Sequence, residues 1–143
     1  MTIQEAENQI IDEFELFDDW MDKYNHIIEL GKSLPPLDNK YKEDKYLIKG
    51  CQARVWLVAK ANNGKIDFFA DSDALITKGI VALLVRVLSG QEPIDIIKSD
   101  LAFIDRIGLK EHLSQTRSNG LNNMIKQMKL FAIALQKSMN QQE

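Results

Sequence analysis

Residues 53–70, Ala-Arg-Val-Trp-Leu-Val-Ala-Lys-Ala-Asn-Asn-Gly-Lys-Ile-Asp-Phe-Phe-Ala, carry the strongest structural signal in this chain. Residues 53–60 are rich in β-branched and aromatic side chains, and every second side chain of residues 65–70 is apolar. Between them lies Asn62-Asn63-Gly64, and Asn and Gly tolerate the positive φ angles of a tight turn. The stretch therefore predicts an antiparallel hairpin, and residues 46–48 are a candidate for a short third strand.

Two helices are expected before the hairpin. Residues 2–5 have the Thr-x-x-Glu pattern of a capping box, and apolar residues then recur at helical spacing up to Phe17. A second helix is expected to start at a cap provided by Asp18 or Asp19. Gly31 is expected to end this helix, because glycine commonly supplies the left-handed residue at a helix C-terminus.

Further helices are expected after the hairpin. The first is capped by Ser72 or Asp73 and is apolar nearly all round, which indicates that it lies deep against the sheet. Pro93 and Asp100 begin two short helices, and Ser118 begins a long one with a continuous apolar stripe. Together these patterns predict an α+β fold in which helices cover a small antiparallel sheet of about three strands.

Length and composition limit the classes of function. The 143 residues fit a single domain spanning residues 1–143. The net charge of −3 argues against a nucleic-acid ligand, and the longest apolar run, residues 79–85, is too short to span a membrane. A single cysteine cannot form an internal disulfide, and the N-terminus has no signal-peptide pattern, so we expect a cytoplasmic protein.

Cys51 is the only cysteine, and it lies where a polar turn runs into the first predicted strand. A thiol is nucleophilic only as the thiolate, and the neighbouring positive charges of Lys49 and Arg54 would raise the thiolate fraction. Burial would raise the thiol pKa instead, so we expect a thiol that is inert in the free protein and reactive in a complex. Gly50 allows backbone conformations that other residues resist. The alternative is an inert cysteine, because unpaired cysteine often packs as a small buried hydrophobe.

Other chemistries find little support in the sequence. Cys51, His26 and His112 are too few and too far apart in sequence for a closed zinc site, so we expect no bound metal. A cysteine hydrolase would need His112 as the base, with Asn119 or Asp73 as the third member, and nothing in the sequence specifies that geometry. No second thiol can attack a persulfide on Cys51 and release sulfide, which suits a sulfur carrier.

A family resemblance agrees with this interpretation. Residues 50–56, Gly-Cys-Gln-Ala-Arg-Val-Trp, resemble the Gly-Cys-Gln-Ser-x-Val-Trp signature of SufE-like sulfur-acceptor proteins, with Ala53 in place of the serine. Further segments are similar to the same family in the same order, namely residues 27–35, 71–74, 78–80, 112–113, 117–118 and 120–121. The likeness therefore extends along most of the chain.

The resemblance implies a SufE/NifU-like α+β fold with the cysteine on a loop at the sheet edge. It implies that Cys51 is the persulfide acceptor and that nearby residues support it, namely Gly50, Gln52, Arg54, Asp73 and Arg117. Asp73 and Arg117 would lie near the loop and set its resting position or the charge around the thiol.

The same resemblance implies a function in iron–sulfur cluster assembly. Sulfane sulfur would pass from a SufS- or CsdA-like cysteine desulfurase to Cys51, and then to a SufBCD-like scaffold complex. The protein would also stimulate the desulfurase, acting as a sulfur-transfer partner rather than a stand-alone enzyme. It would need no cofactor of its own, since the pyridoxal phosphate (PLP) belongs to the desulfurase. The alternative is an allosteric activator that binds the desulfurase without carrying sulfur, and a homodimer is left open.

Overall fold

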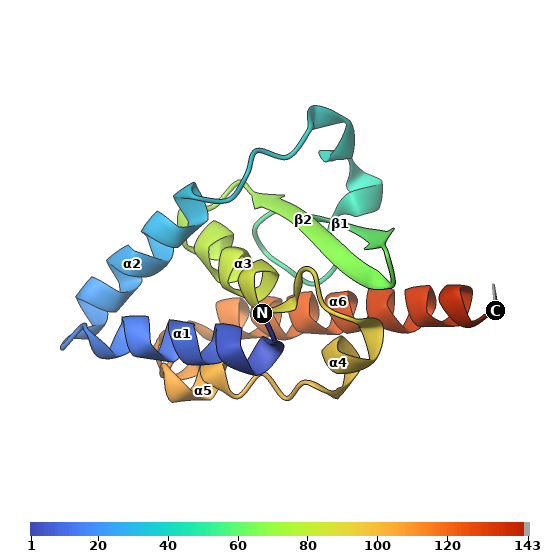
Figure 1. Ribbon diagram of the computed structural model, residues 1–143. Helices are drawn as coiled ribbons and strands as arrows, with labels where there is room; N and C mark the ends of the chain where they lie inside the picture. Colours follow the sequence, from blue (N-terminus) through green and yellow to red (C-terminus); the bar gives the residue numbers. More distant parts are fainter. Residues whose placement is uncertain (142–143) are drawn as a thin grey trace.

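The structure is a computed structural model that describes residues 1–141. Six α-helices and one β-hairpin make up most of it (Figure 1). The helices are α1 (Ile3–Glu15), α2 (Trp20–Lys32), α3 (Leu75–Leu88), α4 (Pro93–Lys98), α5 (Phe103–Arg106) and α6 (Gln115–Gln141). The strands are β1 (Val55–Asn62) and β2 (Lys65–Ser72), and the short 3-10 turns are η1 (Asn39–Tyr41), η2 (Asp44–Tyr46) and η3 (Lys110–His112).

The predicted hairpin is confirmed. β1 and β2 pair antiparallel from Val55 opposite Ser72 to Asn62 opposite Lys65. The first strand is therefore shifted by two residues from the predicted 53–60, and the second runs two residues beyond the predicted 65–70. Asn63 and Gly64 have φ angles of 52° and 81°, the positive values that a two-residue hairpin turn of type I′ requires.

The expectation of about three strands is wrong, because the described residues form a sheet of two strands. The candidate third strand at residues 46–48 contributes a single bridge, between Leu47 and Trp56. The 3-10 turn η2 occupies the chain up to Tyr46, and a turn follows at Lys49 and Gly50. The extended segment between them is therefore too short to form a ladder.

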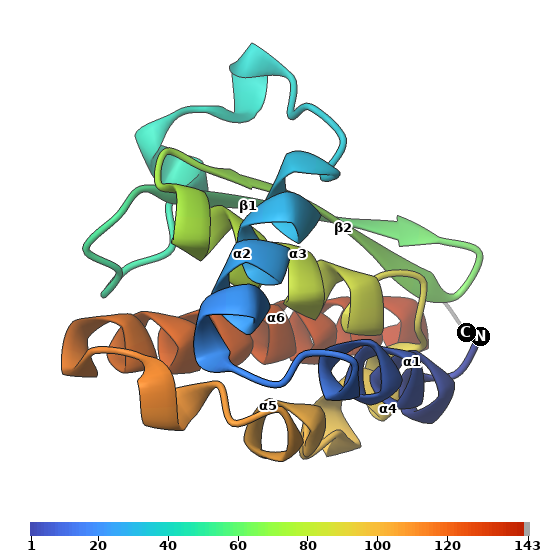
Figure 2. The same ribbon diagram turned by 90° about the vertical axis from the view of Figure 1, so that its left-hand side faces the viewer.

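Helix α3 lies at the centre of the molecule, between the hairpin, α2 and α6 (Figure 2). It is buried nearly all round, as its sequence predicts. Its side chains belong to one hydrophobic core, to which all the helices and both strands contribute residues. The largest fully buried side chains of this core include Phe14, Ile27, Leu57, Ile66, Leu83 and Phe103. Burial of this apolar surface is the main force that holds the helices against the hairpin.

Helices α2 and α3 cross at two glycines. A Cβ atom on Gly79 would lie 2.1 Å from the carbonyl oxygen of Ile27, and one on Gly31 would lie 2.7 Å from the backbone nitrogen of Gly79. The expectation that Gly31 ends the second helix is wrong, because α2 continues to Lys32. Gly31 is required for close approach of two backbones and not for a left-handed conformation.

Several helix boundaries differ from the sequence prediction. α1 ends at Glu15, two residues before the predicted end at Phe17. Of the two candidate caps of the second helix, Asp18 and Asp19, the structure uses Asp19. α5 begins at Phe103 instead of directly after Asp100. No helix of residues 1–141 is long and apolar enough to cross a membrane.

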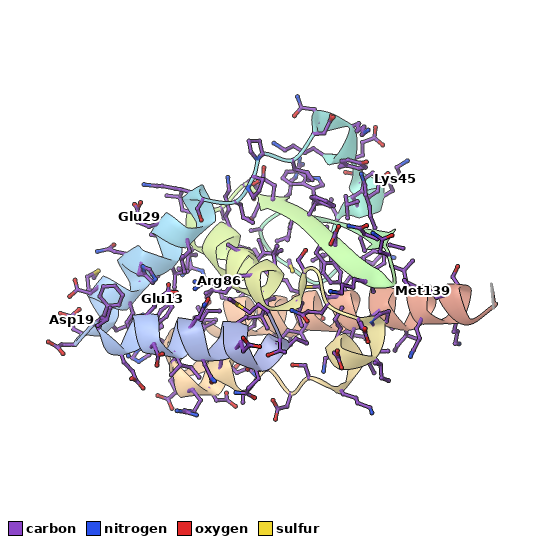
Figure 3. All side chains as sticks on the ribbon, viewed as in Figure 1. Glu13, Asp19, Glu29, Lys45, Arg86 and Met139 are labelled. Carbon is purple, nitrogen blue, oxygen red and sulfur yellow. The ribbon has the colours of Figure 1, made fainter. Side chains whose placement is uncertain are left out.

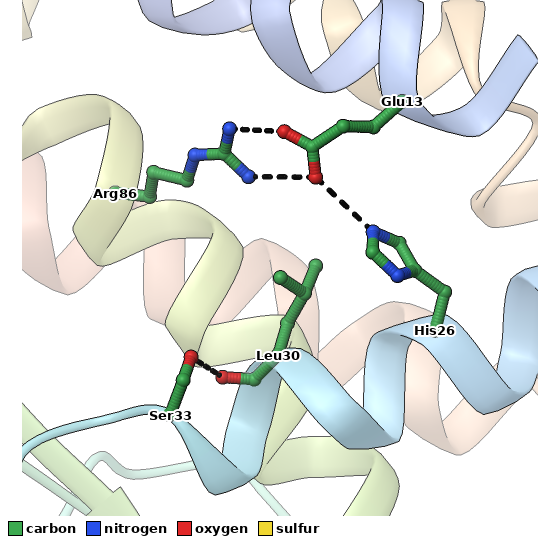
Figure 4. A network of polar contacts seen from close by, with 5 residues as sticks. All are labelled: Glu13, His26, Leu30, Ser33 and Arg86. Atoms are coloured by element: carbon green, nitrogen blue, oxygen red, sulfur yellow. Dashed lines mark hydrogen bonds and ion pairs between the residues drawn. The ribbon is translucent and has the colours of Figure 1, made fainter.

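An ionic contact joins the N-terminal helices to α3 (Figures 3 and 4). Both terminal nitrogens of Arg86 donate to the carboxylate of Glu13, and His26 Nε2 lies 3.1 Å from Glu13 Oε1. The hydrogen bonds from Arg86 hold the pKa of Glu13 below its usual value. His26 also packs against the rings of Phe14 and Phe17, so its contacts are those of a packing residue at the edge of the core.

Candidate functional site

The Cys51 loop, defined here as residues 49–54, connects the Leu47 bridge to β1 and lies against the first turns of α6 (Figure 2). Two hydrogen bonds join the loop to that helix. The Cys51 thiol donates to the carbonyl oxygen of Gly120 at 3.5 Å, and Asn123 Nδ2 donates to the carbonyl oxygen of Gly50 at 2.9 Å. Gly50 has a φ of 83°, in the left-handed region that glycine adopts readily.

A cavity of about 320 Å³ lies beside the thiol. Its walls come from the Cys51 loop, from residues 73–80 at the start of α3, and from residues 116–124 at the start of α6. Ile80 and Met124 make part of the wall apolar, whereas Gln52 and Arg117 bring polar groups. Segments far apart in the sequence therefore enclose the space next to the sulfur atom.

The thiol is held in a form that resists ionisation. Cys51 is half-buried, and burial raises the pKa of its thiol above the ordinary value. Lys49 and Arg54 are both exposed to solvent, where water screens their charges. In this conformation of the loop, burial therefore outweighs the flanking charges, in agreement with the expectation of a thiol that is inert in the free protein.

Asp73 fixes the end of the loop where it enters β1. Its carboxylate accepts a hydrogen bond from the backbone nitrogen of Arg54 at 3.0 Å, and its own backbone nitrogen donates to the Arg54 carbonyl. The Ser72 hydroxyl donates to that same carbonyl at 2.8 Å. These contacts explain why neither side chain is the N-cap of α3, a position that Ala74 occupies.

The two predicted supporting arginines, Arg54 and Arg117, differ in their position relative to the cavity. The Arg54 side chain is exposed and does not line the cavity, whereas Arg117 is exposed at the cavity wall. The backbone nitrogen of Arg117 donates to the hydroxyl of Ser114, which satisfies a free amide in the first turn of α6. This serine explains why α6 begins at Gln115 and not at Ser118 as predicted.

Sequence reasoning missed two residues that contact the loop. Gly120 offers its carbonyl oxygen to the thiol, and a Cβ atom there would lie 3.6 Å from Cys51 Sγ, an ordinary contact. Asn123 contacts Gly50 from a position 73 residues further along the chain. Gly120 belongs to a segment that carried the family resemblance, but no local pattern distinguishes Asn123 from the other polar residues of α6.

The histidines lie elsewhere. The ring of His112 stacks on Trp20 with centroids 4.0 Å apart, and His26 contacts Glu13. Among residues 1–141, neither histidine lines the cavity beside Cys51, so the arrangement of a cysteine hydrolase is not formed there. In the same range, no group of three or more His, Cys, Asp or Glu side chains is placed to hold a metal ion.

Comparisons with known proteins agree with this architecture. The family model described as "SufE: Fe-S metabolism associated domain" matches residues 8–132. An uncharacterized SufE-like protein of Rhizobium meliloti is 40% identical over 127 residues, which cover 85% of this chain and 91% of the relative. The sulfur acceptor protein CsdE of Escherichia coli is 43% identical over 105 residues, which cover 72% of this chain and 71% of CsdE.

A solved structure shares the fold. The solution structure of a hypothetical protein from Thermus thermophilus superposes with a TM-score of 0.74, covering 90% of this chain and 94% of that one at 18% identity. The α+β class predicted from the sequence is thereby confirmed. The family match and the identities to the curated relatives also confirm the resemblance recognised in the signature around Cys51. The chain belongs to the SufE family of Fe–S metabolism associated proteins.

Proposed function

We propose that this protein is a persulfide sulfur acceptor in which Cys51 takes sulfane sulfur from a PLP-dependent cysteine desulfurase and passes it to an iron–sulfur cluster scaffold. The observation that carries the proposal is the position of Cys51. This only thiol of the chain lies on a loop beside a cavity of about 320 Å³. The relative CsdE, 43% identical, is named a sulfur acceptor.

The transfer step needs no redox partner. The Cys51 thiolate attacks the outer sulfur of the donor's persulfide, a bond forms between the two sulfurs, and the donor's S–S bond breaks. The donor cysteine leaves as its thiolate, and Cys51 becomes the persulfide. A second exchange of the same kind, with a thiol of the scaffold, passes the sulfur on and restores the Cys51 thiol.

The resting structure favours storage over reaction. Burial raises the pKa of Cys51, so at neutral pH the thiol is largely protonated and a weak nucleophile. The cavity beside Sγ has room for one additional sulfur atom. We therefore expect a free protein that reacts slowly, and a loop that moves toward the donor when the desulfurase is bound.

The partners and the compartment belong to the same proposal. The donor is a desulfurase of the SufS or CsdA type, the receiver is a SufBCD-like scaffold complex, and the exchange takes place in the cytoplasm. Arg117 at the cavity wall and Arg54 in the Cys51 loop are both exposed, so their charges are available for contact with the donor.

Intact mass after incubation with a desulfurase and free cysteine tests the proposal. The protein should gain one sulfur atom, the gain should map to Cys51, and a reductant should remove it. Cys51→Ser should gain none. The alternative function, an allosteric activator without sulfur carriage, predicts instead that Cys51→Ser still stimulates desulfurase turnover as the unaltered protein does. A Cys51→Ser protein that supports full sulfur delivery to the scaffold would refute the carrier proposal.

A further inference from the structure

One side chain outside the family signature holds the Cys51 loop to α6. Asn123 Nδ2 donates to the carbonyl oxygen of Gly50 at 2.9 Å. Gly50 directly precedes the acceptor cysteine, so this bond fixes the backbone next to the sulfur atom. The only other contact of this kind between the loop and α6 in residues 1–141 is the weak thiol bond to Gly120 at 3.5 Å.

Gly50 and Asn123 are also fitted to each other sterically. A Cβ atom on Gly50 would lie 2.2 Å from Asn123 Nδ2, well inside the contact distance of two heavy atoms. The absence of a side chain at position 50 is thus what admits the amide. The loop backbone is therefore fitted to the Asn123 side chain in two ways: position 50 has no Cβ atom, and its φ is 83°, a value that glycine adopts readily.

We propose that Asn123 is a positioning residue that holds the Cys51 loop in its retracted state, and that release of the Asn123–Gly50 bond accompanies sulfur acceptance. This inference rests on the proposed sulfur-acceptor function and names the element that controls access to its site. In the retracted state the thiol donates to Gly120 and is half-buried beside the cavity. A donor persulfide reaches the sulfur only after the loop leaves α6.

The population of the released state sets the reactivity of the free protein. If reagents attack Cys51 only in that state, the observed rate is the intrinsic rate multiplied by the released fraction. A hydrogen bond that is present only in the retracted state stabilises that state by its net free energy, and this lowers the released fraction by the corresponding factor. For one hydrogen bond at a solvent-accessible site, the factor is about two to ten.

Alkylation of the free full-length protein by iodoacetamide measures this fraction. Asn123→Ala removes the donor, and Asn123→Leu removes it while keeping a side chain of similar size without adding charge. Both should be alkylated about two to ten times faster than the unaltered protein. Asn122→Ala is the matched control, because Asn122 is the exposed neighbour on the same helix, and its rate should not change.

Two readouts separate a positioning role from a general loss of stability. Local release exposes little surface, so the faster alkylation should depend only weakly on urea, whereas global unfolding gives a steep dependence. With the desulfurase and cysteine, Asn123→Ala should also need a lower desulfurase concentration for half-maximal sulfur loading. If both Asn123 variants are alkylated at the rate of Asn122→Ala, or if the acceleration follows global unfolding, the proposal is overturned.

The same measurements distinguish a failure of this inference from a failure of the proposed function. If the unaltered protein is loaded with sulfur while the Asn123 variants behave as the control does, only the role of Asn123 fails. If the variants are alkylated faster but no form of the protein accepts sulfur, the proposed function fails and the link between release and sulfur acceptance fails with it.

Discussion

Replacing Gly79 by alanine should destabilise the protein, whereas the same change at Gly120 should not. Both glycines lie inside helices, so each substitution gains about 0.5 to 1 kcal/mol from the better helix propensity of alanine. The two sites differ in what the new methyl group meets. At Gly79 it would lie 2.1 Å from the Ile27 carbonyl oxygen and 2.5 Å from Ile27 Cγ2, whereas at Gly120 it would lie 3.6 Å from Cys51 Sγ.

The size of the effect at Gly79 follows from which atoms can move. The obstructing oxygen belongs to the backbone of α2, so the helix itself must shift away from α3. Overpacking of this kind costs about 1 to 3 kcal/mol, and more where the backbone cannot adjust. After the propensity gain we expect Gly79→Ala to lower the free energy of unfolding by about 2 kcal/mol. Gly120→Ala should raise it by up to about 1 kcal/mol.

Urea unfolding followed by circular dichroism measures both changes. With a slope of about 1 to 3 kcal/mol per molar urea, the midpoint of Gly79→Ala should fall by about 1 M, while that of Gly120→Ala should stay or rise. The reasoning would be refuted if Gly79→Ala were as stable as the unaltered protein, or if Gly120→Ala lost as much stability as Gly79→Ala.

Three further predictions concern the site and the ionic contact. Because burial raises the pKa of Cys51, the pH at which alkylation of the free protein is half-maximal should lie above that of the same cysteine in urea-unfolded protein, and an equal or lower value contradicts the burial argument. The thiol should correspondingly reduce stability as the pH rises through its unfolded pKa toward its folded pKa. Because Arg86 lowers the pKa of Glu13, this pair should stabilise the fold above the ordinary glutamate pKa and lose that contribution as the pH falls through the lowered one. Glu13→Gln should remove this part of the pH dependence and cost on the order of 1 kcal/mol at neutral pH, measured by thermal unfolding, and an unchanged acid profile would contradict it. Asp73→Ala removes the acceptor of the Arg54 amide and should both lower stability by about 1 kcal/mol and speed alkylation of Cys51, while no change in either would show that Asp73 does not hold the loop.

The hairpin could be predicted because its determinants are local. β-branched and aromatic residues favour extended strands, and Asn63-Gly64 supplies the positive φ angles that join them. The boundaries that failed depend on partners distant in sequence. Ser72 and Asp73 have the chemistry of helix caps, but their side chains bond to the backbone of Arg54, which lies beside them at the start of the neighbouring strand.

The candidate site could also be predicted only in part from the sequence. The sequence identified Cys51 because it is the only thiol and lies in a recognisable signature, and it named Asp73 and Arg117 through the family resemblance. The structure brings these three to one cavity, whereas the Arg54 side chain lies outside it. The direction of the thiol pKa shift agrees with the expectation of a thiol that is inert in the free protein, but how far the thiol is buried depends on how α3 and α6 pack around the loop.

The α+β class, the hairpin and the family could be established from the order of residues, and Cys51 could be named as the candidate acceptor, since each depends on residue chemistry or on patterns within a few neighbours. Only the folded arrangement reveals that Gly31 serves a helix crossing, that the thiol is sheltered, and that Asn123 reaches Gly50 across 73 residues. The physical reason is that close packing and burial arise between segments that meet only in the folded chain, and no local pattern of side chains specifies which segments these are.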